Sequence, residues 1–404
     1  MRAQTAIPPS TRLKSGVILS LFLLLFTGLA DNQMIAALLP VFMRDFRVSV
    51  AMAGMLVVVY SIAAAFAGFI CGTLSDHYGR RRFMLGGVLV FAAASCLSAE
   101  TRTFSELMMV RTLTGAAAGT ISTCALTFAG DCFDYAVRGR AIGLISVAYF
   151  AAPIIGVPAG AEIADRFGWR KTFIFFALVA CVAAASMWLL RGEGGGRARV
   201  ENKLRATARA IQSFLTRRDL AAGIVIAFLV SGGMVGFLTY IGEWLNRSFG
   251  LTTRGIGWVF MLGGLVAVLG APLGGILSDR WGKLKISVLG SVLLAVSLAV
   301  MPFFPWGVLL LAVFGLTSLG TAFRQGPVTA LMTEIIPGRQ RGAYMAARGV
   351  FSQLGIGATA FVGGILYQHH GYAAVTGLCA LMTAGVVLLL LAFVREPEAA
   401  ARIT

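Results

Sequence analysis

Residues 72–82 read GTLSDHYGRRR and residues 275–285 read GILSDRWGKLK, so one charged motif is written twice in this chain. Gly, Leu, Ser, Asp and Gly recur at the same spacing, at an offset of 203 residues. Each copy follows a long apolar run. A chain that repeats a long unit in this way is built from two related halves.

The composition identifies the environment of the chain. Of its 404 residues, 58% are hydrophobic and 13% are charged, whereas a soluble domain carries roughly 25% charged residues. Because so few charges do not cover a water-facing surface, we expect an integral membrane protein in a lipid bilayer. The net charge of +17 comes from Lys and Arg between apolar segments, which indicates membrane topology rather than a nucleic-acid partner.

Twelve apolar segments are long enough to cross a bilayer, which needs roughly 20 apolar residues. They span 16–41, 51–74, 83–99, 104–129, 141–163, 171–190, 220–244, 255–277, 286–304, 307–332, 343–367 and 374–393. With the repeat, they predict an all-α membrane protein whose twelve transmembrane helices form two pseudo-symmetric six-helix bundles. An even number of helices in each half gives both halves the same orientation, an arrangement that is typical of transporters.

Basic residues predict the orientation of the chain. Most of the 34 Lys and Arg residues lie before the first segment, in every second loop and in the tail, so we expect both termini in the cytoplasm. The predicted division is a bundle at 1–190, a basic linker at 191–219 and a bundle at 220–404. In the linker, one helical face suited to the inner membrane surface carries Leu204, Ala208, Ile211 and Leu215. A disordered basic tether is the alternative.

The motif at Gly72, Leu74, Asp76, Gly79 and Arg80 resembles the signature of the major facilitator superfamily between its second and third helices. The resemblance covers essentially the whole chain and implies transport by alternating access. It also implies that the motif is a cytoplasmic latch, with Asp76 facing the start of the eleventh helix and Arg80 paired with Asp131. The alternative is that the arginines only set topology.

The second copy of the motif predicts a second latch. Leu284 stands where the first copy has Arg81, so we expect this latch to be weaker. Together the two predicted latches comprise Gly72, Asp76, Gly79, Arg80, Asp131, Arg138, Gly275, Asp279, Gly282, Glu334 and Arg341.

Small residues recur at every fourth position in four segments. Such stripes let helix backbones approach closely in lipid, and their recurrence in both halves predicts a close seam between the halves. Ordinary helix packing is the alternative. The stripes are Ala64, Gly68 and Gly72; Ala148, Ala152, Gly156 and Gly160; Ala267, Ala271 and Gly275; and Gly355, Thr359 and Gly363.

Two ionisable residues lie deep within predicted helices, where charges are costly and commonly functional. Asp31 is roughly 22 Å and Arg111 roughly 20 Å from the inner surface of a ~30 Å core. Because the depths match, we predict that the two side chains pair and couple proton movement to transport. A purely structural pair is the alternative. The repeat places Met234 and Phe314 at the corresponding positions, so the other half lacks this pair.

Two further motifs resemble the drug:proton antiporter branch of the superfamily. Arg111 followed by Gly115 is similar to its fourth-helix motif. The run AYFAAPIIGVPAG at 148–160 is similar to its fifth-helix antiporter motif, with Ala152, Pro153, Gly156 and Gly160. It departs from that motif because Ala152–Pro153 and Gly156–Val157 replace Gly-Pro and Gly-Gly. The resemblance implies antiport.

The remaining predicted site residues line a substrate cavity between the halves. They are Thr27, Gln33, Gly115, Ser122, Phe237, Tyr240, Arg324 and Gln325. For Phe237 and Tyr240, aromatic packing is the alternative. Arg324 with Gln325 suits an anionic substrate, whereas we expect the side chain of Arg348 to reach the membrane interface.

These features predict a transporter rather than an enzyme. The six cysteines are not at metal-ligand spacing and no phosphate-binding glycine loop is present, so we expect no metal and no cofactor, with the proton gradient as energy source. The predicted function is proton-coupled multidrug or metabolite efflux by an antiporter, a monomer in a bacterial inner membrane. The alternative is a proton symporter that takes up an organic anion.

Overall fold

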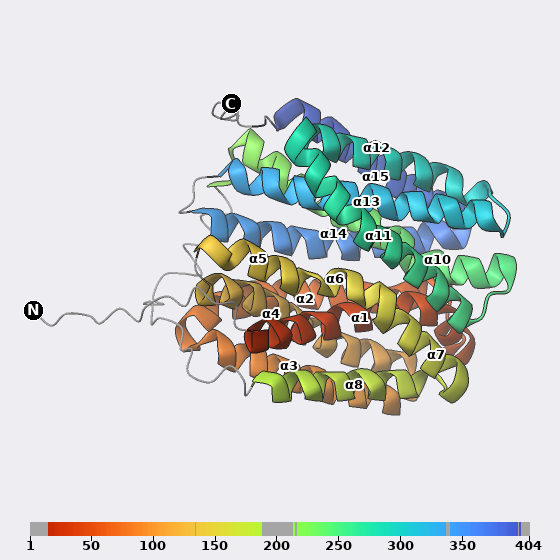
Figure 1. The fold of residues 1–404 in the computed structure, drawn as a ribbon. Coiled ribbons are helices and arrows are strands. Elements are labelled where there is room, and N and C mark those ends of the chain that lie inside the picture. Colours follow the sequence, from red (N-terminus) through yellow and green to blue (C-terminus); the bar gives the residue numbers. More distant parts are fainter. Residues whose placement is uncertain are drawn as a thin grey trace, which may run out of the picture.

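The fold is known from a computed structural model that describes residues 15–133, 135–187, 213–214, 216–336, 340–394 and 396. Within this part of the chain, 12 helices are long and apolar enough to cross a membrane (Figure 1). The predicted all-α fold with twelve spans is confirmed. The surface helix predicted for the linker lies outside the described residues.

The first half contains one helix for each predicted segment, and the fifth is divided into short pieces. The elements are α1 (Ser15–Phe46), α2 (Val50–Tyr78), α3 (Arg80–Glu100), α4 (Phe104–Cys132), α5 (Tyr135–Ser146), α6 (Ala148–Ala151), η1 (Ala152–Gly156), α7 (Val157–Phe167) and α8 (Trp169–Ser186).

The second half repeats this order. Its elements are α10 (Arg218–Phe249), α11 (Thr253–Trp281), α12 (Lys283–Val300), η3 (Met301–Phe303), α13 (Val308–Glu334), α14 (Arg341–His370) and α15 (Tyr372–Phe393). Most helices extend beyond the apolar segments because their last turns carry polar residues at the membrane surface.

Local signals place equivalent helix ends at the same offset in both halves. Ser49 accepts a hydrogen bond from the Met52 amide at 3.3 Å and caps α2, and Thr252 caps α11 in the same way through Gly255 at 3.2 Å. Such hydroxyl caps satisfy amides at the start of a helix. The repeat therefore includes the residues that begin the helices as well as the charged motif.

The charged motif contains a sharp turn between two helices in each half. Gly79 ends α2 with a φ of 96°, and Gly282 ends α11 with a φ of 99°. Glycine adopts this backbone conformation without the steric penalty of a side chain. The spacing of the motif thus places one glycine at each turn, with the charged residues around it.

The fifth membrane span is irregular where its sequence contains prolines. Pro153 lies in a π-helical turn, η1, and Pro158 lies in the first turn of α7. Proline has no amide hydrogen and its ring displaces the preceding turn. Short π-helical segments are frequent at functional sites. Here the segment coincides with the antiporter-like motif at 148–160.

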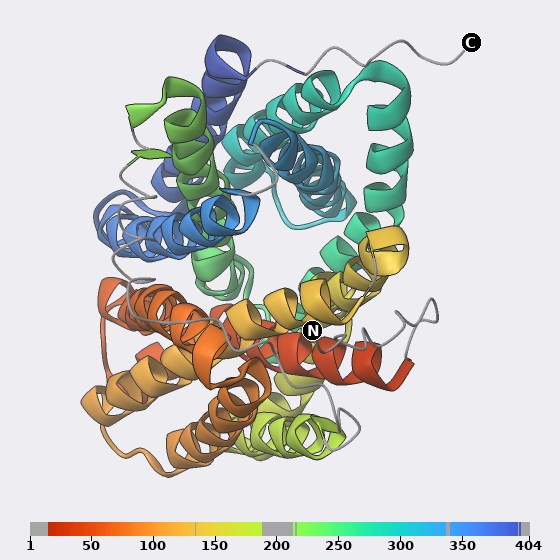
Figure 2. The same ribbon diagram turned by 90° about the vertical axis from the view of Figure 1, so that its left-hand side faces the viewer.

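The two halves form separate groups of helices that meet along a seam. The latch end of the bundle is defined by the turns at Gly79 and Gly282, and the far end by the ends of α1 and α10 at Phe46 and Phe249. Figure 2 views the molecule from the latch end, with the first half coloured red to yellow-green and the second green to blue. Across the seam, α2 contacts α14, α7 contacts α11 and α1 contacts α10.

Glycines show that the described halves approach closely toward the far end. A methyl group on Gly54 would overlap the Tyr240 hydroxyl, and one on Gly242 would lie 2.0 Å from the Ala36 carbonyl oxygen. The other glycines with contacts across the seam are Gly257, Gly264, Gly357 and Gly364, and all lie in the far-end part of their helices. Toward the latch end, a methyl group on Gly139, Gly275 or Gly349 would meet no atom of the described residues within 4 Å.

Candidate transport site

Asp31 and Arg111 form an ion pair inside the first half. The Arg111 Nη1 lies 2.5 Å from the Asp31 Oδ2, and both side chains are 0% exposed. The predicted contact between α1 and α4 is confirmed. Because an isolated charge in a low-dielectric interior costs several kcal/mol, each residue compensates the charge of the other.

Tyr60 of α2 completes the surroundings of this pair. The Arg111 guanidinium lies 4.7 Å from the centre of the Tyr60 ring, a cation–π distance. The Tyr60 hydroxyl donates to the Gly28 carbonyl at 3.1 Å. A methyl group on Gly115 would lie 2.3 Å from the Tyr60 carbonyl oxygen, so this glycine lets α4 approach α2. Tyr60 was not predicted as a site residue, although a tyrosine within an apolar segment was a signal.

The ion pair uses only part of its hydrogen-bonding capacity. The Asp31 Oδ1, the Arg111 Nε and Nη2, and the nearby Asn32 Oδ1 are buried without a hydrogen-bond partner. Buried polar atoms are satisfied in most structures. The free Asp31 oxygen can accept a proton, and the Arg111 nitrogens can donate to a water molecule or a polar ligand group.

Other predicted cavity residues of the first half take part in helix contacts. Thr27 is fully buried and its hydroxyl donates to the Leu23 carbonyl at 2.8 Å. Ser122 is half-buried and donates to the Gly119 carbonyl at 3.2 Å, and Gln33 is half-buried. Their role in a substrate cavity stays a prediction.

The predicted aromatic residues of α10 are buried in the second half. The Tyr240 hydroxyl donates to the Ala360 carbonyl and lies against Gly54 across the seam. Phe237 is 3% exposed, and its carbonyl accepts a hydrogen bond from Tyr372 at 3.1 Å. Both aromatic side chains therefore pack between helices near the far end, at a different place from Arg324.

Arg324 and Arg348 are both buried in the second half. Arg324 is fully buried, and its Nη2 lies 3.4 Å from the Val230 carbonyl, whereas Gln325 is exposed. The expectation for Arg348 was wrong, because its side chain is 8% exposed and donates to the Gly223 carbonyl at 3.2 Å. A methyl group on Gly223 would overlap the Tyr344 hydroxyl of α14, so this glycine lets α10 and α14 approach each other here.

The first latch is centred on Arg80. Its guanidinium pairs with Asp76 at 2.8 Å and with Asp131, and donates to the Thr127 carbonyl at 2.7 Å. The predicted Arg80–Asp131 pair is confirmed. The expected contact of Asp76 with the start of α14 stays a prediction.

The other first-latch residues support helix ends and close packing. Arg138 donates to the Phe133 carbonyl at 3.1 Å. A methyl group on Gly72 would lie 2.8 Å from the Thr123 side chain, so Gly72 allows α2 to approach α4. These contacts join α2, α4 and α5 at the latch end.

The second latch repeats the central ion pair with other residues. Lys283 stands at the repeat position of Arg80 and pairs with Glu334, the counterpart of Asp131. Glu396 accepts hydrogen bonds from the amides of Lys283 at 2.9 Å and Leu284 at 3.3 Å, as an acid at a helix start does. Asp279 and Arg341 are exposed. The offset would have identified Lys283, whereas nothing in the motif pointed to Glu396.

Three of the four small-residue stripes face neighbours within their own half, so their assignment to the seam was wrong. In the remaining stripe, a methyl group on Gly275 would meet no atom of the described residues within 4 Å. Gly156 faces Ala30, where a methyl group would lie 2.4 Å from the Ala30 Cβ, and Gly160 faces Met34. Gly355 approaches the Phe228 carbonyl in α10. Stripes at every fourth residue occupy the face where neighbouring backbones of one bundle are closest, and the seam uses a different face of the same helices.

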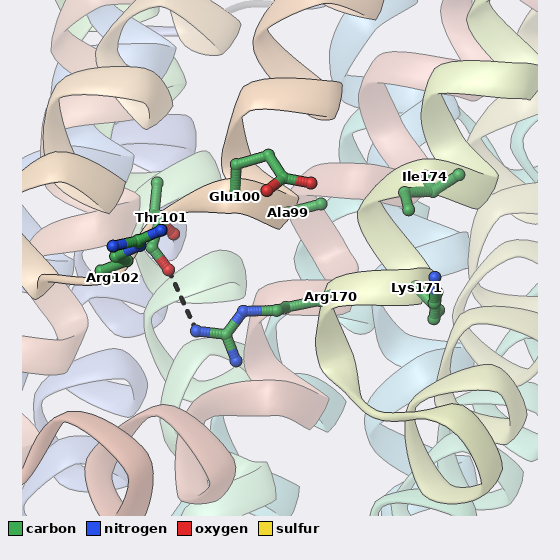
Figure 3. Close-up of a pocket in the computed structure, with 7 residues that line it drawn as sticks. All are labelled: Ala99, Glu100, Thr101, Arg102, Arg170, Lys171 and Ile174. Carbon is green, nitrogen blue, oxygen red and sulfur yellow. Dashed lines mark hydrogen bonds between the residues drawn. The ribbon is translucent and has the colours of Figure 1, made fainter.

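A small open cavity of about 310 Å³ lies at the far end between the end of α3 and the start of α8 (Figure 3). It is lined by Ala99, Glu100, Thr101, Arg102, Arg170, Lys171 and Ile174. Arg170 points toward Thr101 and donates to its carbonyl at 3.0 Å. This cavity belongs to the surface of the first half and is separate from Asp31. Among the described residues, no group of three His, Cys, Asp or Glu side chains is placed to hold a metal ion.

Twelve membrane-crossing helices in two repeated halves, with a buried ion pair in one of them, define a membrane transporter. The sequence profile of the Major Facilitator Superfamily matches residues 21–252 and, separately, residues 223–404. The chain belongs to this superfamily, and it is a transporter of small molecules rather than an enzyme.

Relatives and a solved structure agree with this assignment. The chain is 26% identical to the MFS-type transporter YwfA of Bacillus subtilis, over 93% of this chain and 91% of that protein. It is 25% identical to multidrug resistance protein 2 of B. subtilis, over 87% and 88%, and 27% identical to a chloramphenicol resistance protein of Streptomyces lividans, over 65% and 66%. The crystal structure of a D-xylose-proton symporter matches the fold with a TM-score of 0.79 at 16% identity, over 95% and 98%.

Proposed function

We propose that this protein is a proton-coupled secondary transporter that exports a small organic molecule, acting as a monomer in a bacterial inner membrane. The buried Asp31–Arg111 ion pair carries the proposal, because it is a titratable site within the membrane with unsatisfied polar atoms. No cofactor is required, since the proton gradient supplies the energy.

The coupling follows from two states of the ion pair. With Asp31 ionised, the pair is electrically compensated, which favours the contact between Asp31 and Arg111. A proton on Asp31 removes the charge that holds Arg111, so the contact between α1 and α4 weakens. A proton shifts the conformational equilibrium only if the two conformations bind it with different affinity. Opening of the pair to water in one conformation supplies that difference.

The contacts between the halves favour alternating access. If the latch end is cytoplasmic, as the basic loops indicate, the close contacts at Gly54 and Gly242 belong to a state that is shut toward the outside. Movement of one half against the other exposes a site near the membrane midplane to one side at a time. The latches at Arg80 and Lys283 are then ready to close the cytoplasmic side.

Two observations support export. Relatives in B. subtilis and S. lividans are named for multidrug and chloramphenicol resistance. The π-helical turn Ala152–Gly156 lies in the antiporter-like motif, and Gly156 places it against Ala30, next to Asp31. The second candidate function is proton-coupled uptake of an organic anion. The buried Arg324, which forms no ion pair with an acid of the described residues, suits an anionic substrate and supports this candidate.

Reconstituted protein tests both direction and coupling. Proteoliposomes that contain a pH-sensitive dye are given a compound that protects an efflux-deficient strain expressing the protein. We expect substrate moving down its gradient to drive protons the opposite way. Protons that accompany the substrate would establish symport instead, and substrate movement without proton movement would overturn the proposal.

The coupling residue is tested in the same assay. Asp31→Asn should keep substrate exchange but lose proton movement. Asp165→Asn is the matched control, since Asp165 is an exposed aspartate at the far end. Unchanged proton movement in Asp31→Asn protein would move the search to other acids, beginning with the buried Glu243 and with Glu106.

A further inference from the structure

Arg324 is a buried cation without a counter-charge. Its side chain is fully buried in α13, its Nε and Nη1 have no hydrogen-bond partner among the described residues, and its Nη2 lies 3.4 Å from the Val230 carbonyl. No carboxylate of the described residues forms an ion pair with it. A buried unpaired charge destabilises a protein, so the fold alone does not account for this arginine.

Arg348 of α14 is a second cation on the same side of α10. It donates to the Gly223 carbonyl at 3.2 Å, and no described acid pairs with it. Gly223 and Val230 are about two helical turns apart, so the two guanidinium groups follow one face of α10. Arg348 is about 10 Å and Arg324 about 15 Å from the latch-end termini of their helices.

The first half shows that the fold does not require these charges. Ile121 and Ile145 occupy the equivalent positions at the offset of 203, and they are 1% and 0% exposed. Conversely, Met234 replaces the acid of the compensated Asp31–Arg111 pair in the second half. One half therefore holds a neutral ion pair and the other holds two uncompensated cations.

The surroundings of the two arginines are mostly apolar, and the Tyr344 side chain lies near Arg348. A buried cluster of hydrophobic side chains lies between α10, α13 and α14, which share the second half (Figure 1). Val230, Val328, Leu331, Met332 and Ala347 belong to it. Guanidinium groups bind carboxylates with two parallel hydrogen bonds, and an apolar body suits the neighbouring side chains.

We propose that Arg324 and Arg348 form the anion-binding part of the substrate site and that the transported molecule is an organic carboxylate with an apolar body. The inference rests on the proposed transport function and names its substrate class. A carboxylate that approaches from the latch end meets Arg348 first and then Arg324. Bound there, it supplies the negative charge that the second half lacks.

Ligand-induced stabilisation of the purified full-length protein tests the proposal. The probes are benzoate and hexanoate, each compared with its neutral amide at equal sodium concentration and neutral pH. A ligand that binds the native state raises the unfolding temperature. We expect both anions to raise it by about 2 °C or more relative to the amides, and Arg324→Gln and Arg348→Gln each to abolish the difference, with partial retention in Arg324→Lys.

A second measurement separates binding from a structural role. Without ligand, Arg324→Met should unfold at the same or a higher temperature than wild type, because it removes an uncompensated buried charge. A lower unfolding temperature would identify Arg324 as a structural donor to Val230 and overturn the proposal. So would equal effects of anions and amides on the wild type, or anion stabilisation that persists in both Gln variants. Because no proton gradient is present, a failure of proton coupling leaves these results unaffected.

Discussion

Glu162 of α7 and Arg254 of α11 form an ion pair that joins the two halves at the far end. The Arg254 Nε lies 2.8 Å from the Glu162 Oε2, and the side chains are 48% and 30% exposed. Arg166 lies 2.5 Å from the other carboxylate oxygen, at an angle outside hydrogen-bond geometry. The pair sits beside the close approach of Gly257 to Ala161, so it must break when the far end opens.

The first prediction concerns this ion pair. Glu162→Gln should shift the population toward a far end that is open, by up to about five-fold, since an exposed pair contributes up to about 1 kcal/mol. Spin labels at positions 165 and 253 in a cysteine-free background measure the separation of α7 and α11. Glu100→Gln is the matched control at the same end. The charge-exchanged pair Glu162→Arg with Arg254→Glu should restore the wild-type distances, and an unaltered distance distribution in Glu162→Gln would refute the role.

The second prediction concerns the turn in the first latch. Gly79→Leu should insert into the membrane but transport slowly and unfold at a lower temperature, because a side chain at a φ of 96° costs about 1–2 kcal/mol. Gly86→Leu is the matched control, since neither glycine has an atom within 4 Å of an added methyl and Gly86 has no positive φ. Equal behaviour of the two variants would show that the turn conformation is unimportant.

The third prediction separates packing within a half from packing across the seam. Gly156→Leu meets Ala30 and should reduce the stability of the first half, whereas Gly264→Leu meets Ile154 of the other half and should open the far end. Thermal unfolding reports the first effect and the spin-label distance reports the second. A changed spin-label distance in Gly156→Leu protein, with no change in its unfolding temperature, would contradict the packing of Gly156 against Ala30 within the first half.

The fourth prediction concerns the mutual dependence of Asp31 and Arg111. Removing either charge alone should destabilise the protein by about 3–5 kcal/mol, and removing both in Asp31→Asn with Arg111→Gln by much less, because only the single variants leave a buried charge. Unfolding of all four proteins in detergent gives the coupling energy. Additive losses would mean that the two side chains do not compensate each other.

The same pair predicts a change in pH dependence. In Arg111→Gln the Asp31 carboxylate has lost the positive neighbour that favours its ionised form. It therefore accepts a proton at a lower proton concentration, and the pH profile of transport should move to higher pH. Proteoliposome transport at a series of symmetric pH values measures the profile. A shift to lower pH would contradict the assignment of Asp31 as the proton acceptor.

Much of this architecture could be predicted from the sequence because it depends on short segments of the chain. Apolar runs predicted the twelve spans, and the offset of 203 predicted the repeated turns at Gly79 and Gly282. The Asp31–Arg111 contact followed from depth, since a membrane restricts side chains to layers and few charges occupy each layer. Arg80–Asp131 was predicted from resemblance alone, because the two residues are far apart in the chain.

Only the tertiary structure decided which faces of the helices meet. The sequence of the stripe at Gly156 is compatible with packing inside the first half or against the second half. In the structure it packs against α1 because the α1 backbone lies closest. The carbonyl partner of Arg348 and the Glu162–Arg254 pair depend on helices that lie far away in the sequence. In lipid, an apolar helix face can lie against lipid or against another helix at similar cost. Hydrophobicity therefore determines only that a helix crosses the membrane. Its rotation and its partners come from the fit of side chains between helices, which no single segment encodes.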